Sequence, residues 1–304
     1  MSCCASAHWG ATASPAPITA ASGGSAPPSL TDNKLDVMQW NVHQNIGTDG
    51  GNLPLRVASH MALQNADVIS INELPTTQSV RDQMRAHLIA VSGQQWSDWY
   101  FDENGSNGNG IIVRSSACSV SSWTSQELSG VQASDRSIVQ ATVNFNGKTV
   151  NVFSTHLDSS SAPESSRVTQ VGEIATFTAP YANPKIIVGD FNTTNTSTLS
   201  GITVNYHDAW AWGISNYTPD RSFKYTDNTG AYTRANRIDY HFFSPKSQPA
   251  VIELVEARIV DTRDMFTYVS SGVSPNVTLT VVAGDDKGVR PSDHNMIMAS
   301  FLVP

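Results

Sequence analysis

The chain has 304 residues, of which 39% are hydrophobic and 14% are charged. This length and apolar content allow a sizeable buried core and exclude an intrinsically disordered protein. The formal net charge of −8 argues against a protein that coats or packages nucleic acid through phosphate contacts alone. A bound cation relaxes that constraint, because the metal supplies positive charge where a phosphate must lie.

Cysteine is scarce, and positions 3, 4 and 118 allow neither a zinc site nor a disulfide framework. The composition, rich in Ser, Thr and Asn and poor in Lys, is typical of exported proteins, so we expect a secreted or periplasmic location. Residues 1–30 lack the charged start and apolar segment of a signal peptide, so we expect that signal to have been removed or to lie upstream. No stretch approaches the roughly 18 apolar residues of a membrane span.

The chain divides into a tail and one folded region. Residues 1–33 are rich in Ala, Ser, Pro and Gly without apolar periodicity, which predicts a flexible tail. Residues 34–304 contain no internal repeat and no second linker. They are therefore expected to form a single domain.

Strands and helices alternate in the first part of this domain. Apolar alternation predicts a strand over residues 35–42, followed by a Gly-rich loop over 47–51. Helical periodicity predicts helices over 55–65 and 80–91, on either side of a short buried strand over 67–71.

The middle of the chain changes to successive β segments, and Asn146-Gly147 between two of them is a strong hairpin signal. A further helix is expected over residues 165–177. Interleaved β and α segments with hairpins favour a single α/β sandwich. The later predicted strands cover residues 111–114, 119–123, 138–145, 150–155, 185–188, 237–243, 251–260 and 296–303.

Polar side chains recur where these predicted strands end. The ends of strands in α/β folds are where ligand sites gather. Oxygen donors without paired cysteines suit Mg²⁺, Mn²⁺ or Ca²⁺, and two histidines near such a cation can move protons during hydrolysis of a phosphate ester. The residues in these positions are Asn41, Glu73, His156, Asp190, Asn192, Asp293 and His294.

Short motifs around these residues match one known family in order. They are Gln39-Trp40-Asn41, Glu73, Ser154-Thr155-His156-Leu157, Gly189-Asp190-Phe191-Asn192, Arg237-Ile238-Asp239-Tyr240 and Ser292-Asp293-His294. On these motifs the chain resembles the endonuclease/exonuclease/phosphatase superfamily, whose best-known member is deoxyribonuclease I. The resemblance implies a four-layer α/β sandwich with two packed central β-sheets flanked by helices, and it makes residues 34–304 the catalytic domain.

The resemblance also implies which residues hold the metal. Glu73 would be the principal metal-binding carboxylate. Asn41, Asp190, Asn192 and Asp293 would complete the coordination of metal and phosphate. The implied cofactor is Mg²⁺, with Mn²⁺ or Ca²⁺ as alternatives.

A second set of implied roles concerns catalysis, in which Asp190 also takes part. Asp239 would orient and charge-stabilise His294, which acts as general base on water or contacts the phosphate. His156 would protonate the leaving oxygen or stabilise the charge on phosphorus. Arg136 resembles a phosphate-binding arginine of relatives, and its planar fork suits that task. Asn192 and His43 are further candidates for contact with the substrate phosphate.

Several positions depart from the pattern of relatives. Asn72 stands where relatives commonly have Gln before the metal-binding Glu, and this shorter side chain is expected to weaken support for the site. His241 replaces an apolar residue, and alternation predicts that it enters the site or forms a hydrogen bond beside it. The acidic partner of His156 is not evident, and Asp98 is the candidate.

The reaction implied is metal-dependent hydrolysis of a phosphoester by in-line attack of water. The first hypothesis for the substrate is DNA, cut by a monomeric endonuclease without a stable protein partner. One alternative is a sphingomyelinase-like phosphodiesterase acting on membrane lipid, which needs an exposed apolar tip such as Tyr100-Phe101. Others are a phosphomonoesterase and a catalytically inactive binding subunit. Trp210, Trp212 and Tyr217 either line the substrate site or pack in the core.

Overall fold

The computed structural model describes residues 33–46, 54–102, 107–132, 136–216, 237–244, 252–260, 266–269, 278–281 and 292–303. Thr31–Pro304 form one compact unit. The tail predicted over residues 1–33 lies outside the described residues except for Asn33, and so do the predicted loop over 47–51 and Tyr217. Among the described helices, none combines the length and apolar character that crossing a membrane requires.

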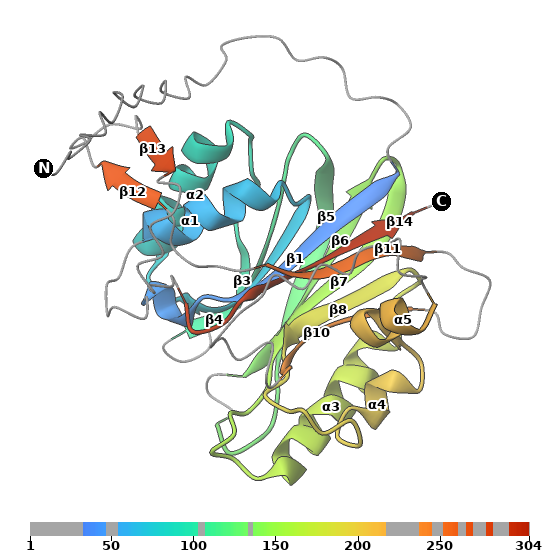
Figure 1. Ribbon diagram of the computed structural model, residues 1–304. Helices are drawn as coiled ribbons and strands as arrows, with labels where there is room; N and C mark the ends of the chain where they lie inside the picture. The colour runs from blue at the N-terminus through green and yellow to red at the C-terminus, as the bar shows by residue number, and fades with distance from the viewer. Residues whose placement is uncertain are drawn as a thin grey trace, which may run out of the picture. The chain divides into compact units, whose positions relative to one another are not determined.

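Two six-stranded mixed sheets form the centre of the fold (Figure 1). The first has the order β11-β14-β1-β2-β4-β3 and comprises β1 (Lys34–Asn41), β2 (Val68–Pro75), β3 (Tyr100–Asp102), β4 (Asn107–Val113), β11 (Glu253–Val260) and β14 (Met296–Leu302). The second has the order β5-β6-β7-β8-β10-β9 and comprises β5 (Cys118–Glu127), β6 (Ser137–Phe145), β7 (Lys148–His156), β8 (Lys185–Asp190), β9 (His207–Asp208) and β10 (Asp239–Ser244). A separate pair joins β12 (Phe266–Val269) and β13 (Thr278–Val281).

Each large sheet contains one parallel pair, β1 with β2 and β7 with β8. The neighbouring strands β14 and β10 run antiparallel to these pairs, and Asp239 at the start of β10 is paired with Asp190 at the end of β8. The ends of the four parallel strands and the beginnings of β10 and β14 therefore meet at one edge. This edge carries the polar motifs.

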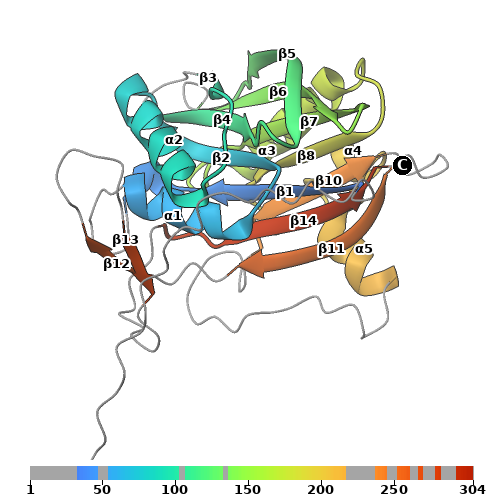
Figure 2. The same cartoon turned by 90° about the horizontal axis from the view of Figure 1, so that it is seen from above.

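Helices cover the outer face of each sheet, as Figures 1 and 2 show. On the first sheet lie α1 (Pro54–Gln64) and α2 (Gln78–Ser92), and on the second lie α3 (Glu164–Thr178) and the short α4 (Ser200–Thr203). The helix α2 ends at Gly93, whose left-handed φ of 66° closes the last turn onto the carbonyl of Ile89. A further helix, α5 (Ala209–Asn216), follows β9, and one 3-10 turn, η1 (His43–Asn45), follows β1.

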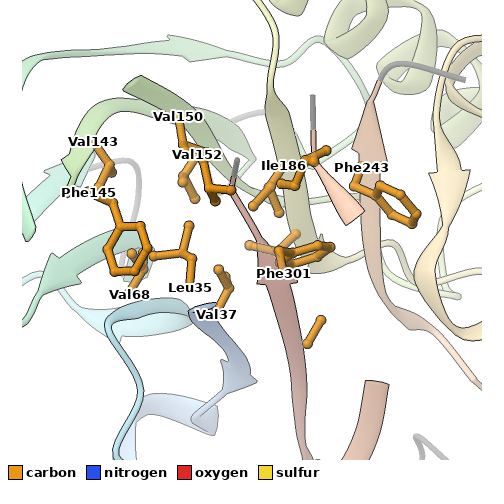
Figure 3. Packing of buried hydrophobic residues seen from close by; sticks show 14 of the residues in the cluster. Leu35, Val37, Val68, Val143, Phe145, Val150, Val152, Ile186, Phe243 and Phe301 are labelled. Carbon is orange, nitrogen blue, oxygen red and sulfur yellow. The ribbon is translucent and has the colours of Figure 1, made fainter. Parts of the chain in front are cut away.

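Three apolar clusters correspond to the three interfaces between these layers. Alternation along β1 illustrates how one strand serves two of them: Leu35 and Val37 point between the sheets, while Met38 and Trp40 pack in the cluster that includes α1 and α2. Figure 3 shows the central layer, where Leu35, Val37, Val68 and Phe301 of the first sheet meet residues of the second. The predicted four-layer α/β sandwich is confirmed.

The predicted strands and helices of the described region are present. The strand expected over residues 67–71 continues to Pro75, β4 begins four residues earlier than expected, and β5 ends four residues later. The short elements η1, β3, α4, β9, α5, β12 and β13 were not predicted. The proposed apolar tip is wrong: Tyr100–Asp102 pairs with β4, and the Phe101 ring is buried 4.1 Å from the guanidinium of Arg81. Trp210 and Trp212 pack against the central core rather than forming a substrate wall.

Candidate active site

The strand ends surround a cleft of about 590 Å³. Most of its surface is polar, and among the described lining residues only Ile238 is apolar with a large side chain. The predicted residues that line it are His43, Glu73, Arg136, His156, Asp190, Asn192, Asp293 and His294. The other two, Asn41 and Asp239, are buried directly behind this surface and bonded to it.

Glu73 reaches the cleft because β2 is irregular there. The pairing of β2 with β4 shifts register between Ile71 and Leu74, and Glu73 itself has a left-handed φ of 55°. A non-glycine residue in this region is strained, and a bulge re-aims the side chain it carries. The side chain of Glu73 remains 21% exposed and is thus open to a ligand.

Asp190 lies at the end of β8, where Gly189 allows a close approach to β7. A Cβ atom on Gly189 would overlap the carbonyl oxygen of Thr155, so only glycine fits. Asp190 is 1% exposed, and burial raises its pKa to about 7, against the opposing charge of His294. This carboxyl can therefore take up a proton near neutral pH.

The Asn41 amide holds the carboxylates of Glu73 and Asp190 in position. Its nitrogen donates to Glu73 Oε1 at 3.0 Å and to Asp190 Oδ2 at 3.1 Å, while its oxygen accepts the backbone N–H of His43 at 3.0 Å. In this arrangement Asn41 positions the carboxylates, and its own oxygen does not face the cleft. Its predicted role as a direct metal ligand stays a prediction.

Asn72 holds Asp190 from the other sheet. Its side-chain oxygen accepts the backbone N–H of Asp190 at 2.9 Å and a bond from Gln39 at 2.5 Å, and its nitrogen donates to Asn109 at 2.7 Å. All four residues are buried. The shorter Asn72 therefore still reaches Asp190, with Gln39 and Asn109 bonded to it from either side, and the expected weakening of support stays a prediction.

His294 lies between two carboxylates. Its Nδ1 is 2.9 Å from Asp239 Oδ2 and its Nε2 is 3.6 Å from Asp190 Oδ2. Burial disfavours the charged ring, but Asp239 and Asp190 outweigh it and raise the pKa of His294 to about 10. A ring charged at neutral pH fits contact with a phosphate, and the alternative role of general base stays a prediction.

His156 has the opposite surroundings. Its Nδ1 lies 3.2 Å from a terminal nitrogen of Arg136, and its Nε2 lies 3.0 Å from the Asn192 amide and 3.7 Å from Asp190 Oδ2. Burial, followed by the charges of Arg136 and His294, holds the pKa of His156 well below its usual range. This ring is neutral at pH 7.

The acidic partner proposed for His156 is not Asp98. The Asp98 side chain is 91% exposed and pairs with Arg85 at 3.4 Å. The acid on this side of the cleft is Asp158, which is fully buried and lies 3.8 Å from Nε of Arg136. Asp158 directly follows the motif that ends in His156-Leu157, and that proximity was the available sequence signal.

Two further histidines are placed by the structure. His43 lines the cleft and follows Asn41 in a turn where His43, Gln44 and Asn45 all have positive φ angles. His241 does not enter the cleft. It is buried between the sheets, where its Nε2 donates to the Val37 carbonyl at 3.2 Å, which corresponds to the second predicted alternative.

The donor set fits a hard divalent cation. Glu73 and Asp190 present oxygens that share one amide donor, and Asp293 adds a half-exposed carboxylate to the same cleft. Among the described residues, one group of three has ligand atoms within 4.8 Å of one another: Asp190, Asp239 and His294. His294 in this group already bonds Asp239, whereas Glu73, Asp190 and Asp293, the ligands predicted from the resemblance, line the same cleft without forming such a compact group.

Sequence reasoning missed the residues that support the site. Trp40 Nε1 donates to the His294 carbonyl at 2.9 Å, and Ser292 donates to the Asn41 carbonyl at 2.6 Å. Trp40 and Ser292 both lie inside the matched motifs. Asn109 carried no sequence signal, because only the pairing of β4 with β2 brings it to Asn72.

Comparison with solved structures shows the same fold. Zebrafish TDP2 in complex with single-strand DNA product is 20% identical, with a TM-score of 0.61 over 89% of this chain and 99% of that chain. A Bacteroides thetaiotaomicron mannosyl-6-phosphatase is 15% identical, with a TM-score of 0.60 over 88% and 99%. No match was found among curated protein sequences.

The family comparison is more specific. The model of the endonuclease/exonuclease/phosphatase family matches residues 38–294, which span the described site from Asn41 to His294. Members of this family hydrolyse phosphoesters, and the buried acid and histidine groups that this chemistry uses are present in this chain. The chain therefore belongs to the endonuclease/exonuclease/phosphatase family and is a phosphoester hydrolase.

Proposed function

We propose that this protein is a divalent-metal-dependent phosphodiesterase that cuts DNA as an endonuclease. The observation that carries the proposal is the convergence of two buried histidines in opposite charge states, His156 and His294, on the carboxylates of one cleft. Pairs of groups whose pKa values are pushed apart are a mark of acid–base sites. The TDP2 structure with a DNA product supports the choice of substrate.

The cation would be held by Glu73, Asp190 and Asp293, and Mg²⁺ is the proposed ion, with Mn²⁺ or Ca²⁺ as alternatives. When bound, it supplies positive charge to the phosphate oxygens and to the developing transition state. This contribution explains how a protein with a net charge of −8 can act on a polyanion.

The side chains of the cleft perform the remaining tasks. Asp190 accepts a proton from the attacking water, which approaches phosphorus in line with the leaving oxygen. As the bond between phosphorus and the leaving oxygen breaks, His294, kept charged by Asp239, donates a proton to that oxygen. His156 offers a neutral N–H, and Arg136 contributes a fixed positive charge beside it.

A second candidate function is hydrolysis of a small polar phosphomonoester. Ser159, Ser160, Thr194 and Asn195 line one wall of the cleft with hydroxyl and amide groups, which suit a polyhydroxylated leaving group. The likeness to a mannosyl-6-phosphatase supports this candidate. A lipid substrate has no comparable support, since Phe101 is buried.

The test incubates purified protein with supercoiled plasmid, mannose 6-phosphate and sphingomyelin vesicles, each with Mg²⁺ or with EDTA. Plasmid nicking that disappears with EDTA and in His156→Ala supports the endonuclease. Phosphate release from the sugar phosphate with intact plasmid supports the second candidate. Release of phosphocholine alone contradicts both.

A further inference from the structure

The Nδ1 side of His156 has an unusual partner. Hydrolytic histidines are commonly backed by a carboxylate, which accepts the Nδ1 proton. Here Nδ1 lies 3.2 Å from a terminal nitrogen of Arg136, and the ring is only 3% exposed. Because a guanidinium donates through five N–H groups and accepts none, this bond requires a lone pair on Nδ1. The single proton of the neutral ring must then be on Nε2.

A competing donor lies on the other side of the ring. The Asn192 amide nitrogen is 3.0 Å from Nε2 and 3.1 Å from the Leu157 carbonyl oxygen. A neutral imidazole has one nitrogen with a lone pair, so it can satisfy Arg136 or Asn192 but not both. Hydrogen bonds from charged donors are roughly twice as strong as neutral ones, and Asn192 has the Leu157 carbonyl as a second acceptor. Arg136 therefore takes the lone pair.

Arg136 is held in place by a buried acid. Asp158 is fully buried, lies 3.8 Å from Arg136 Nε, and accepts the backbone N–H groups of Val131 at 3.1 Å and Gln132 at 3.2 Å. The Gln132 side chain in turn accepts from Arg136 at 3.2 Å. Burying a carboxylate costs free energy unless it is paired, so these contacts of Asp158 should be kept. They connect the segment before β6 to the end of β7. The guanidinium has little freedom to leave Nδ1.

We propose that Asp158 is a positioning residue which, through Arg136, fixes His156 in the tautomer that carries its proton on Nε2. His156 lines the cleft, and its Nε2 lies 3.7 Å from Asp190 Oδ2 and 4.0 Å from Glu73 Oε1, so in this tautomer the N–H would be available to a phosphoryl oxygen bound there. His156 then acts as a neutral hydrogen-bond donor. The effect on turnover rests on the proposed function, whereas the tautomer does not.

The tautomer is measured by two-bond ¹H–¹⁵N correlation spectra of the metal-free full chain labelled with ¹⁵N-histidine, with His156→Ala to assign the signal. The variants are Asp158→Asn and Arg136→Gln, and the matched control is Asp98→Asn, which alters an exposed acid paired with a different arginine. We expect the Nε2–H tautomer in the wild type and in Asp98→Asn. Both other variants should shift toward Nδ1–H and lose about tenfold or more in kcat on bis-p-nitrophenyl phosphate, with KM little changed.

A wild-type ring in the Nδ1–H form would mean that Asn192 takes the lone pair, and it would overturn the proposal. Variants that lose activity or thermal stability while keeping the wild-type tautomer would overturn it equally, because Asp158 would then have only a structural role. Arg136→Lys retains a cationic donor and should keep Nε2–H, which guards against variants that fold poorly. If the wild type hydrolyses no phosphoester, the proposed function fails, but the spectra still decide the tautomer.

Discussion

The two sides of the cleft place the same residue type in opposite surroundings. His156 and His294 both stand at the edge where the central strands end, and they are similarly buried, at 3% and 6% exposure. Burial alone would make both rings neutral. Asp239 and Asp190 keep His294 charged, whereas Arg136 helps to keep His156 neutral. Because the two rings are similarly buried, the carboxylates beside His294 account for its different charge state, whereas burial itself, followed by the charge of Arg136, keeps His156 neutral.

Removal of either imidazole ring is expected to have the largest effect on activity. His294→Ala and His156→Ala should each lower turnover of a small phosphodiester about 1,000-fold, because each donates to the phosphate. Their stabilities should differ. His294→Ala leaves Asp239 and Asp190 buried without their cation and should lose roughly 3 kcal/mol in unfolding free energy, while His156→Ala leaves Arg136 with Asp158 and Gln132.

Urea unfolding of the metal-free variants measures this difference. Equal losses of stability in the two variants would contradict the opposite charge states. A His294→Ala variant as stable as the wild type would do so as well.

Removing the carboxylate behind His294 should have the next largest effect. Asp239→Asn is expected to lower turnover about 100-fold. Because Asp239 raises the pKa of His294, the variant should also lose activity at a lower pH than the wild type when the pH is raised. The pH–rate profile measures this shift. Asp208→Asn is the matched control, since Asp208 lies on the neighbouring strand β9 and pairs with Arg237 at 2.6 Å. A profile that moves equally in both variants would argue against a specific pair.

The proposed role of Glu73 as a metal ligand can be tested by titrating the enzyme with Mg²⁺. Glu73→Gln should raise the Mg²⁺ concentration for half-maximal turnover at least about tenfold, because it removes one charge from the oxygen ligands. Glu164→Gln is the control. Glu164 lines the same cleft, but its oxygens are taken by Thr193, Thr198 and Arg167. An unchanged Mg²⁺ titration in Glu73→Gln would remove Glu73 from the ligands.

A third histidine, His241, is buried like His156 and His294, and its ring bonds the backbone carbonyl of Val37. Burial lowers its pKa to about 3, from 6.5, so the unfolded chain binds a proton that the folded ring refuses. This contribution to stability is present above pH 6.5 and is lost as the pH falls toward 3, by up to about 1.4 kcal/mol per pH unit. Urea unfolding of metal-free wild type and His241→Gln over roughly the range from pH 7 to pH 5 should show a shallower dependence of the unfolding free energy on pH in the variant. Parallel slopes would mean that His241 titrates normally.

Many of the strands and helices can be predicted from the local sequence pattern. A strand buried on two faces shows apolar residues at alternate positions on each, as Leu35 and Val37 do on one face of β1 and Trp40 on the other. A helix buried on one face shows helical periodicity, as around Val57 and Met61. The helix α5 was not predicted, because its eight residues contain too few turns for a helical period to be recognised. The motifs at strand ends likewise indicated the edge at which the site lies.

Local sequence is enough to predict which residue types stand at the strand ends, because motif and alternation are local properties of the chain. The partners of these residues depend on the tertiary structure. Asn41 meets Asp190 across 149 positions and Asn72 meets it across 118, through the packing of two sheets against each other. The antiparallel pairing of β6 with β7 places Arg136 rather than Asp98 beside His156, and the packing of the two sheets places two carboxylates around His294. The charge state of each histidine follows from these long-range contacts, which no local pattern encodes.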